Sequence, residues 1–531
     1  MKQFNISRAL QLLACILCLT CSSCGWLELE PEDGVIRDKF WKTKEEVHSA
    51  VMGCYASMME DRVMERYFLW GEMRADMVEP TTRAQADIIA IYNGEIGSGN
   101  AFTTWDYFYR TINQCNTVLE LAPLAREKDP SFSETLLRQY SAEATCIRSL
   151  AYFYLLRTFR DVPYITKASI YDNQKFSVPK NAQEDILDSL IVSLKRVEPD
   201  IPFNYNSVAA NKGRFNAWGL KALLADIYLW KNDYAASIEL CTQIMNSGQY
   251  SLVPVGREEV LVEGALVDKV YYANESDVSR MFQSMYINGN SVESILELQF
   301  GTDKENPFVR MFSPGYSVLQ PKTANFSTEY FMRSAIDRGW ADIRGEGVSY
   351  ASTYIWKWIG LTSSAPFSYR QVGNSFSNWI FYRLADIYLM KAEALTQQAM
   401  LNGDQTKLQE ALELVGKIRE RANAPESTDL LFGHSGSIEA KTLEEFILRE
   451  RAREFTFEGK RWFDVLRHAR RDNYSEKNLA YLLRMSVLCA PPEKAMSLLS
   501  KWQHHKGSHY LPINENEINT NKLLIQNEFY K

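Results

Sequence analysis

The sequence predicts a mainly α-helical protein, in which a tetratricopeptide-like scaffold of helix pairs carries an irregular, loop-rich, ligand-facing lobe. Several segments repeat apolar residues at steps of three and four, which is the period of a helix with one buried face. One segment has the small-residue helix–turn–helix pattern of a tetratricopeptide pair. Residues 248–376, in contrast, show weak periodicity and many Gly, Ser and Asn residues, which interrupt regular elements.

The first 24 residues have the order of a secretory signal. Lys2 gives a positive start, residues 9–19 are apolar, and small serines lead into Cys24. This apolar run is too short for a membrane-spanning helix, which needs about 20 residues. A cysteine in this place resembles the lipobox of a bacterial lipoprotein, and the alternative is an ordinary cleaved signal before an incidental cysteine. We expect residues 1–23 to be a signal peptide and Cys24 to be lipidated.

An acidic tether and an N-terminal helical scaffold should follow the signal. Residues 24–39 carry several carboxylates, which favours an extended, lipidated tether with little core of its own. The N-terminal scaffold is expected over residues 40–247. Its first helix should begin near Thr43, because Thr43 and Glu46 have the spacing of a capping box.

The scaffold should continue with long helices and one clear helix pair. Apolar spacing predicts helices over residues 103–122 and 134–159, and the second should stop before Pro163. Residues 214–246 predict a tetratricopeptide-like pair, because small alanines lie where two helices would touch and a short turn at residues 231–233 separates them.

A C-terminal helical segment over residues 377–531 is expected to extend the same scaffold. Residues 378–398 and 408–423 resemble a second helix pair with a longer turn, and residues 143–157 could belong to a third. Because one such pair cannot bury its apolar face alone, neighbouring pairs should stack on one another.

Two irregular stretches interrupt the helices, at residues 80–104 and in the lobe at residues 248–376. Within the lobe, residues 294–300 have a strand-like run of apolar residues. Long irregular segments are uncommon in compact proteins and are often functional. We therefore expect these two stretches to meet the ligand.

Composition and motifs argue against several function classes. The net charge of −7 disfavours a nucleic-acid binder, and the five cysteines after Cys24 show no spacing typical of zinc or disulfide frameworks. His505 and His509 stand four apart near His504, but Gly507 lies between them, so a solvated loop is expected rather than a metal site. No phosphate-binding or serine-hydrolase motif lies in a suitable context. We expect no catalytic residues, no metal and no cofactor.

The charged segment at residues 449–467 is interpreted as structural. Glu450 and Glu454 stand four apart, as do Arg449 and Arg453, which indicates a helix whose ion pairs lock it to its neighbours. Gly459 should close a turn after it. The same structural role is expected for Arg383, Asp386 and Glu393, and the tryptophans assigned to the core are Trp105, Trp218, Trp379 and Trp462.

Several sequence blocks, in order, carry a family resemblance. They are Phe40-Trp41, residues 142–154 with Asp161-Val162-Pro163, residues 382–394, residues 449–467, and residues 510–513 with 526–530. Behind a lipobox, this order resembles the SusD/RagB family of Bacteroidetes outer-membrane lipoproteins over essentially the whole mature chain.

The resemblance implies a helical fold with tetratricopeptide-type pairs and a lipid-anchored, surface-exposed place on the cell outer membrane. It also implies a partner, a SusC-like TonB-dependent transporter, over which the protein would act as a lid. Such proteins capture glycans, or peptides in some branches, and pass them inward without catalysis. The acidic residues after Cys24 look like the surface-export signal of these lipoproteins.

Candidate ligand residues come from residue chemistry, since the family shares no ligand motif. The apolar face of a sugar stacks on Tyr or Trp, and its hydroxyl groups bond to Arg, Asn or Asp. An oligosaccharide is the expected ligand, and a peptide receptor or a surface glycoside hydrolase are the alternatives. The candidates are Arg83, Tyr92, Asn93, Tyr271, Tyr272, Asn274, Trp340 and Tyr350, and for each aromatic the competing role is packing within the lobe.

Overall fold

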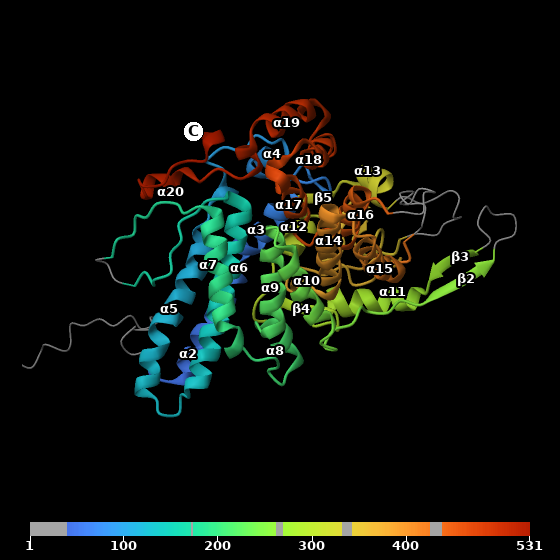
Figure 1. Ribbon diagram of the computed structural model, residues 1–531. Coiled ribbons are helices and arrows are strands. Elements are labelled where there is room, and N and C mark those ends of the chain that lie inside the picture. The colour runs from blue at the N-terminus through green and yellow to red at the C-terminus, as the bar shows by residue number, and fades with distance from the viewer. Residues whose placement is uncertain (1–39, 171–173, 262–268, 332–341, 425–437) are drawn as a thin grey trace, which may run out of the picture.

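The computed structural model describes residues 40–170, 174–261, 269–331, 342–424 and 438–531. Over these residues the chain is mainly helical, with strands in four separate two-stranded ladders, so the predicted fold class is confirmed. Figure 1 shows the early helices side by side at one end, the later helices stacked next to them, and the β2–β3 hairpin projecting from the opposite end. Cys24 and the tether lie outside the described residues.

The N-terminal scaffold begins with the predicted capping box. The Thr43 side chain accepts a hydrogen bond from the Glu46 amide, and the Glu46 carboxylate accepts one from the Thr43 amide at 3.0 Å. The helix predicted at 134–159 is confirmed, and the one predicted at 103–122 is present but begins at Asp106 and ends at Lys128. Helix α5 packs against both α2 and α6. These helices are α2 (Lys44–Met58), α3 (Asp61–Glu72), α5 (Asp106–Lys128) and α6 (Glu134–Phe159).

Two helix pairs stack to form the centre of the scaffold. The predicted pair at residues 214–246 is α9 with α10, and the Ser237 hydroxyl on α10 donates to the Ala225 carbonyl on α9 at 3.0 Å. Helix α10 also packs on α14, so the second pair follows the first in space although the lobe separates them in the sequence. The helices are α7 (Gln183–Val197), α8 (Val208–Gly213), α9 (Ala217–Trp230), α10 (Tyr234–Met245), α14 (Leu384–Asn402) and α15 (Gln405–Arg421), with a 3₁₀ turn η2 (Glu198–Asp200).

The lobe enters the scaffold through a buried ladder of two strands. β4 (Ser294–Leu298), predicted as a strand, pairs antiparallel with β8 (Trp379–Arg383), and every residue of both strands is buried. The prediction of one helix over residues 378–398 is therefore wrong at its start, because α14 begins at Leu384. The aromatic and β-branched run of β8 suits a strand once β4 offers a partner.

Short elements make up the rest of the lobe and of the 80–104 stretch. The latter was expected to be irregular, yet it contains a helix of seven residues, α4. The ladders are β1 (Val78–Pro80) with β5 (Leu319–Pro321), β2 (Arg257–Leu261) with β3 (Lys269–Ala273), and β6 (Tyr350–Ala351) with β7 (Tyr354–Ile355). The short helices are α4 (Ala86–Tyr92), η1 (Ala101–Thr103), α11 (Glu275–Phe282), η3 (Gln283–Ile287), α12 (Phe308–Phe312), α13 (Thr323–Asn325) and η4 (Phe326–Tyr330).

The C-terminal helices fold back over the N-terminal part. His504 and His505 are exposed as expected, but the prediction of a solvated loop is wrong for His509, which is fully buried with Nε2 2.9 Å from the Trp502 carbonyl oxygen. Of the tryptophans assigned to the core, Trp218 is only partly buried, beside Phe203. The elements are α16 (Ala440–Glu454), α17 (Arg461–Tyr474), α18 (Glu476–Cys489), α19 (Pro492–His504), η6 (Lys506–His509), α20 (Glu515–Thr520) and η7 (Glu528–Tyr530).

A buried network of ion pairs joins the lobe to the scaffold. All five N–H groups of Arg383 donate hydrogen bonds, at 2.5–3.1 Å, to the carboxylates of Glu293, Glu454 and Glu458 and to the Glu454 carbonyl. Glu454 also accepts hydrogen bonds from Arg344 of the lobe, at 2.9 Å, and from Arg421 of α15. The structural interpretation of residues 449–467 is confirmed.

Loss of one charge from this network should destabilise the protein strongly. Glu454→Gln leaves Arg383, Arg344 and Arg421 short of a buried counter-charge, and breaking a buried pair costs about 3–5 kcal/mol. Chemical denaturation should show this loss in the free energy of unfolding. The control is Glu445→Gln. Glu445 pairs at 2.7 Å with Arg484, which is largely exposed, so loss of this ion pair should cost less than about 1 kcal/mol. Equal effects of the two variants would contradict the proposed role.

The same network should make the protein sensitive to acid. Burial by itself would raise the pKa of Glu450, but Arg344, Arg453 and Arg419 outweigh it and hold the pKa at about 2. Burial is likewise outweighed at Glu393, where Arg467 and Arg471 hold the pKa at about 2.

Because these folded-state pKa values lie below the unfolded ones, the stabilisation should be complete above about pH 4.5 and should be lost as the pH falls toward 2. Urea titrations across this range measure it. A free energy of unfolding that stays constant between pH 4.5 and 2.5 would argue against this account.

Candidate functional site

The two stretches expected to meet the ligand are joined by the β1–β5 ladder. Strand β1 enters the 80–104 stretch and β5 belongs to the lobe, and they pair antiparallel with Pro80 opposite Leu319. Beyond this end of the ladder, the Thr81 amide donates to the Val318 carbonyl at 3.0 Å, and the Thr81 hydroxyl donates to the Ser317 carbonyl at 2.7 Å. Segments far apart in the sequence therefore form one continuous surface.

An exposed guanidinium and an exposed ring lie at the same end of this ladder. Arg83 is exposed, and its backbone amide donates to the Thr81 hydroxyl at 3.2 Å. Tyr316 stands just before the paired segment of the lobe and is 56% exposed. A ring face and a planar hydrogen-bond donor are the two groups that a sugar ring needs from a protein surface. We refer to the exposed groups of residues 81–93 and 316–322 as the ladder surface.

Tyr316 was missed by the sequence analysis. It follows Pro314-Gly315, and Gly315 has a φ of +88°, a left-handed conformation that favours glycine. A Pro-Gly pair marks a turn, and an aromatic residue beside a turn in the lobe is the signal that would have found it.

Tyr92 and Asn93 lie at the end of α4. Tyr92 is half-buried, and its hydroxyl accepts a hydrogen bond from the Lys322 ammonium of the lobe at 3.0 Å. Burial and the nearby carboxylate of Glu79 raise the pKa of Tyr92 above its usual range. The hydroxyl therefore stays protonated and can donate to a ligand while it accepts from Lys322.

Of the remaining candidates, those that the structure describes lie elsewhere. Tyr271 and Tyr272 lie on β3, which Figure 1 shows in the projecting hairpin, away from α4. Tyr272 is 38% exposed, whereas the side-chain oxygen of Asn274 accepts from two amides at the start of α11 and serves as its N-cap. Tyr350 packs in the lobe with its ring 5.1 Å from that of Phe326. Trp340 lies outside the described residues.

A polar hollow of the described chain is lined in part by residues of the 85–104 segment. It has a volume of about 650 Å³ and lies between the start of α5 and the α20 region. Its aromatic residues are Phe102 and Tyr107, and two guanidinium groups lie near the Tyr107 ring, Arg66 at 4.9 Å and Arg110 at 5.3 Å from the ring centre. None of the residues predicted from the sequence lines this hollow.

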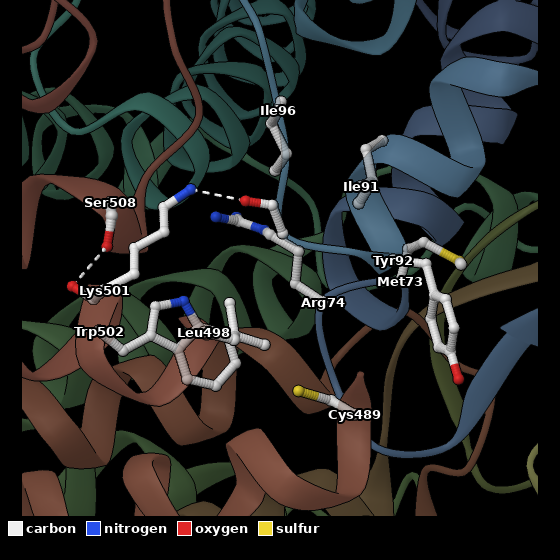
Figure 2. Close-up of a pocket in the computed structure, with 11 residues that line it drawn as sticks. Met73, Arg74, Ile91, Tyr92, Ile96, Cys489, Leu498, Lys501, Trp502 and Ser508 are labelled. Atoms are coloured by element: carbon white, nitrogen blue, oxygen red, sulfur yellow. Dashed lines mark hydrogen bonds between the residues drawn. The ribbon is translucent and has the colours of Figure 1, made fainter. Parts of the chain in front are cut away.

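A smaller cavity lies behind Tyr92. Figure 2 shows Tyr92 at one side of it and the cationic ends of Arg74 and Lys501 together at the other. Its volume is about 10 Å³, so it cannot receive a sugar ring.

The described residues show neither a cluster of three metal-ligating side chains nor a helix with the length and hydropathy of a membrane span. The five described cysteines are free and buried. Each acts as a small apolar side chain of the core.

Two family models match the chain. The SusD family model, named for SusD and RagB, matches residues 267–530, and a SusD-like model described as "Starch-binding associating with outer membrane" matches residues 25–229. Together they include both the scaffold and most of the lobe.

Similar proteins and structures agree with these matches. A SusD-like protein of Formosa agariphila is 28% identical over 504 residues, which is 88% of this chain and 92% of the relative. A SusD-like protein of Bacteroides ovatus is 24% identical over 88% of this chain and 83% of its own. A SusD superfamily crystal structure from Bacteroides thetaiotaomicron has a TM-score of 0.68 at 23% identity, covering 92% of this chain and 99% of that one. The helix pairs, the lobe and these matches place the chain in the SusD/RagB family.

Proposed function

We propose that this protein is a cell-surface lipoprotein that captures oligosaccharides and delivers them to a SusC-like TonB-dependent transporter in the outer membrane. The observation that carries the proposal is the ladder surface, where the exposed Arg83 and Tyr316 lie at one end of the β1–β5 ladder. Family membership supports it, because SusD-like proteins are binding proteins rather than enzymes and are associated with glycans and the outer membrane.

Binding at this surface would be non-covalent and shallow. The ring of Tyr316 offers a stacking face, Arg83 offers several N–H donors, and Tyr92 offers a hydroxyl oriented by Lys322. None of these three groups is a carboxylate, whereas glycoside hydrolysis requires a pair of carboxylates. Retention beside a transporter, rather than reaction, is the function that these groups support.

The ladder surface should lose oligosaccharide affinity when either exposed group is removed. Arg83→Ala and Tyr316→Ala should each weaken binding about tenfold, since a stacked ring or a charge-assisted hydrogen bond is worth about 1–2 kcal/mol. A glycan array identifies the ligand, and isothermal titration calorimetry measures the change.

Phe203→Ala is the matched control, because Phe203 is an aromatic residue that is 59% exposed, far from the ladder. If Tyr272→Ala weakens binding and Tyr316→Ala does not, the β2–β3 hairpin is the platform instead. Release of shorter sugars during the incubation would indicate a hydrolase, and retention of peptides alone would indicate a peptide receptor.

The lipid anchor has its own test. A palmitate analogue should label the protein in cells, and Cys24→Ala should abolish the labelling because the thiol is the acylated atom. Cys54→Ala is the control, since Cys54 is buried and its loss should leave labelling intact. Persistent labelling of the Cys24→Ala protein would place the acyl group elsewhere.

A further inference from the structure

A buried cation, Arg74, and a partly buried one, Lys501, line the small cavity behind Tyr92. Arg74, just after α3, is 6% exposed, and its Nη1 donates to the His509 carbonyl at 2.7 Å. Its guanidinium carbon lies 4.3 Å from the centre of the Trp462 ring. The other terminal nitrogen, Nη2, is buried and meets no acceptor among the described residues.

The second positive charge at the cavity is that of Lys501, on α19. Its Nζ donates to the Gly94 carbonyl at 2.7 Å and lies 4.6 Å from the centre of the Phe529 ring. Figure 2 shows its end next to that of Arg74. In the described chain, neither cation forms an ion pair with a carboxylate. The nearby Glu95 is exposed and forms its ion pair with Lys494 at 2.5 Å.

Such an arrangement is unfavourable without a counter-charge. The rest of the cavity lining is largely apolar, with Met73, Ile91, Ile96 and Leu498 among its residues. Burial, and then the charge of Arg74, lower the pKa of Lys501 to about 8. Burial also lowers the pKa of Arg74, to about 10. Buried charges in proteins are ordinarily paired, and a buried donor ordinarily has an acceptor.

We propose that this cavity binds one small monovalent anion of halide size, with chloride as the physiological ion, between the Arg74 guanidinium and the Lys501 ammonium. The volume of about 10 Å³ leaves room for one small ligand and is too small for a sugar ring. The anion would accept from Nη2 and would supply the negative charge that the described lining lacks.

The site also bears on the ladder surface. Lys501 holds the carbonyl of Gly94, and Gly94 directly follows Tyr92 and Asn93. An anion that holds Lys501 in place would therefore order the segment carrying these two residues. This second step rests on the proposed function, whereas the anion site itself does not.

Anion-dependent stability of the full mature protein tests the site. Denaturation is followed in sodium chloride, sodium bromide and sodium gluconate at equal ionic strength, gluconate being too large for the cavity. Above the Kd of the site for chloride, each tenfold rise in chloride concentration should lower the unfolding equilibrium constant about tenfold. Gluconate should have no such effect. Arg74→Met and Lys501→Met should remove this dependence. Lys494→Met, on the exposed face of the same helix, should retain it.

Crystals grown in bromide give a second readout. An anomalous peak is expected between Arg74 Nη2 and Lys501 Nζ, and it should be absent in Lys501→Met. A water at that position, together with equal stability in chloride and gluconate, would overturn the proposal. If bromide is seen in the crystals but halides do not change the stability in solution, the ion binds at crystal concentration only, and the proposal is overturned.

Glycan affinity, measured in chloride and in gluconate, separates the two proposals. If halides change the stability of the protein but not its affinity for glycans, only the proposed coupling between the anion site and the ladder surface is contradicted. Halide binding in a protein that retains no oligosaccharide contradicts the proposed function and leaves the anion site standing.

Discussion

The position of the lobe depends on one buried side chain, the guanidinium of Arg383. This residue ends the buried strand β8 and directly precedes α14, so it lies where lobe and scaffold meet. Its donors reach Glu293 of the lobe and Glu454 and Glu458 at the end of α16. This arrangement of strand, helix and lobe therefore leaves no N–H group of Arg383 without an acceptor.

Ion pairs in such a place contribute geometry more than net stability. Removing charges from water is costly, and apolar residues of the same shape can give a protein that is equally stable. A guanidinium, however, directs its five donors in a fixed plane, whereas an apolar contact accepts many orientations. We infer that the network around Arg383 and Glu454 serves to select one docking of the lobe on the helix pairs.

The ladder surface relies on this docking. A two-stranded ladder of three residues on each side is marginal by itself, so β1 and β5 stay paired only because the scaffold holds β1 and the ion network holds the lobe. Arg83 and Tyr316 then come together from segments far apart in the sequence. The proposed anion site would act next to the same surface, through Lys501 and Gly94, at the contact between α19 and the segment after α4.

The sequence by itself determined those features that depend on residues close together along the chain. The capping box of Thr43 and Glu46, both ends of α6, the α9–α10 pair and the structural role of Glu454 follow from periodicity and spacing, and ordered motifs sufficed for the family. The tertiary structure alone decided that residues 379–383 form a strand, that His509 is buried, and that Tyr316 rather than Tyr350 reaches the ladder surface. Strand pairing and burial depend on partners far along the chain, and a local pattern does not specify which distant segment will supply them.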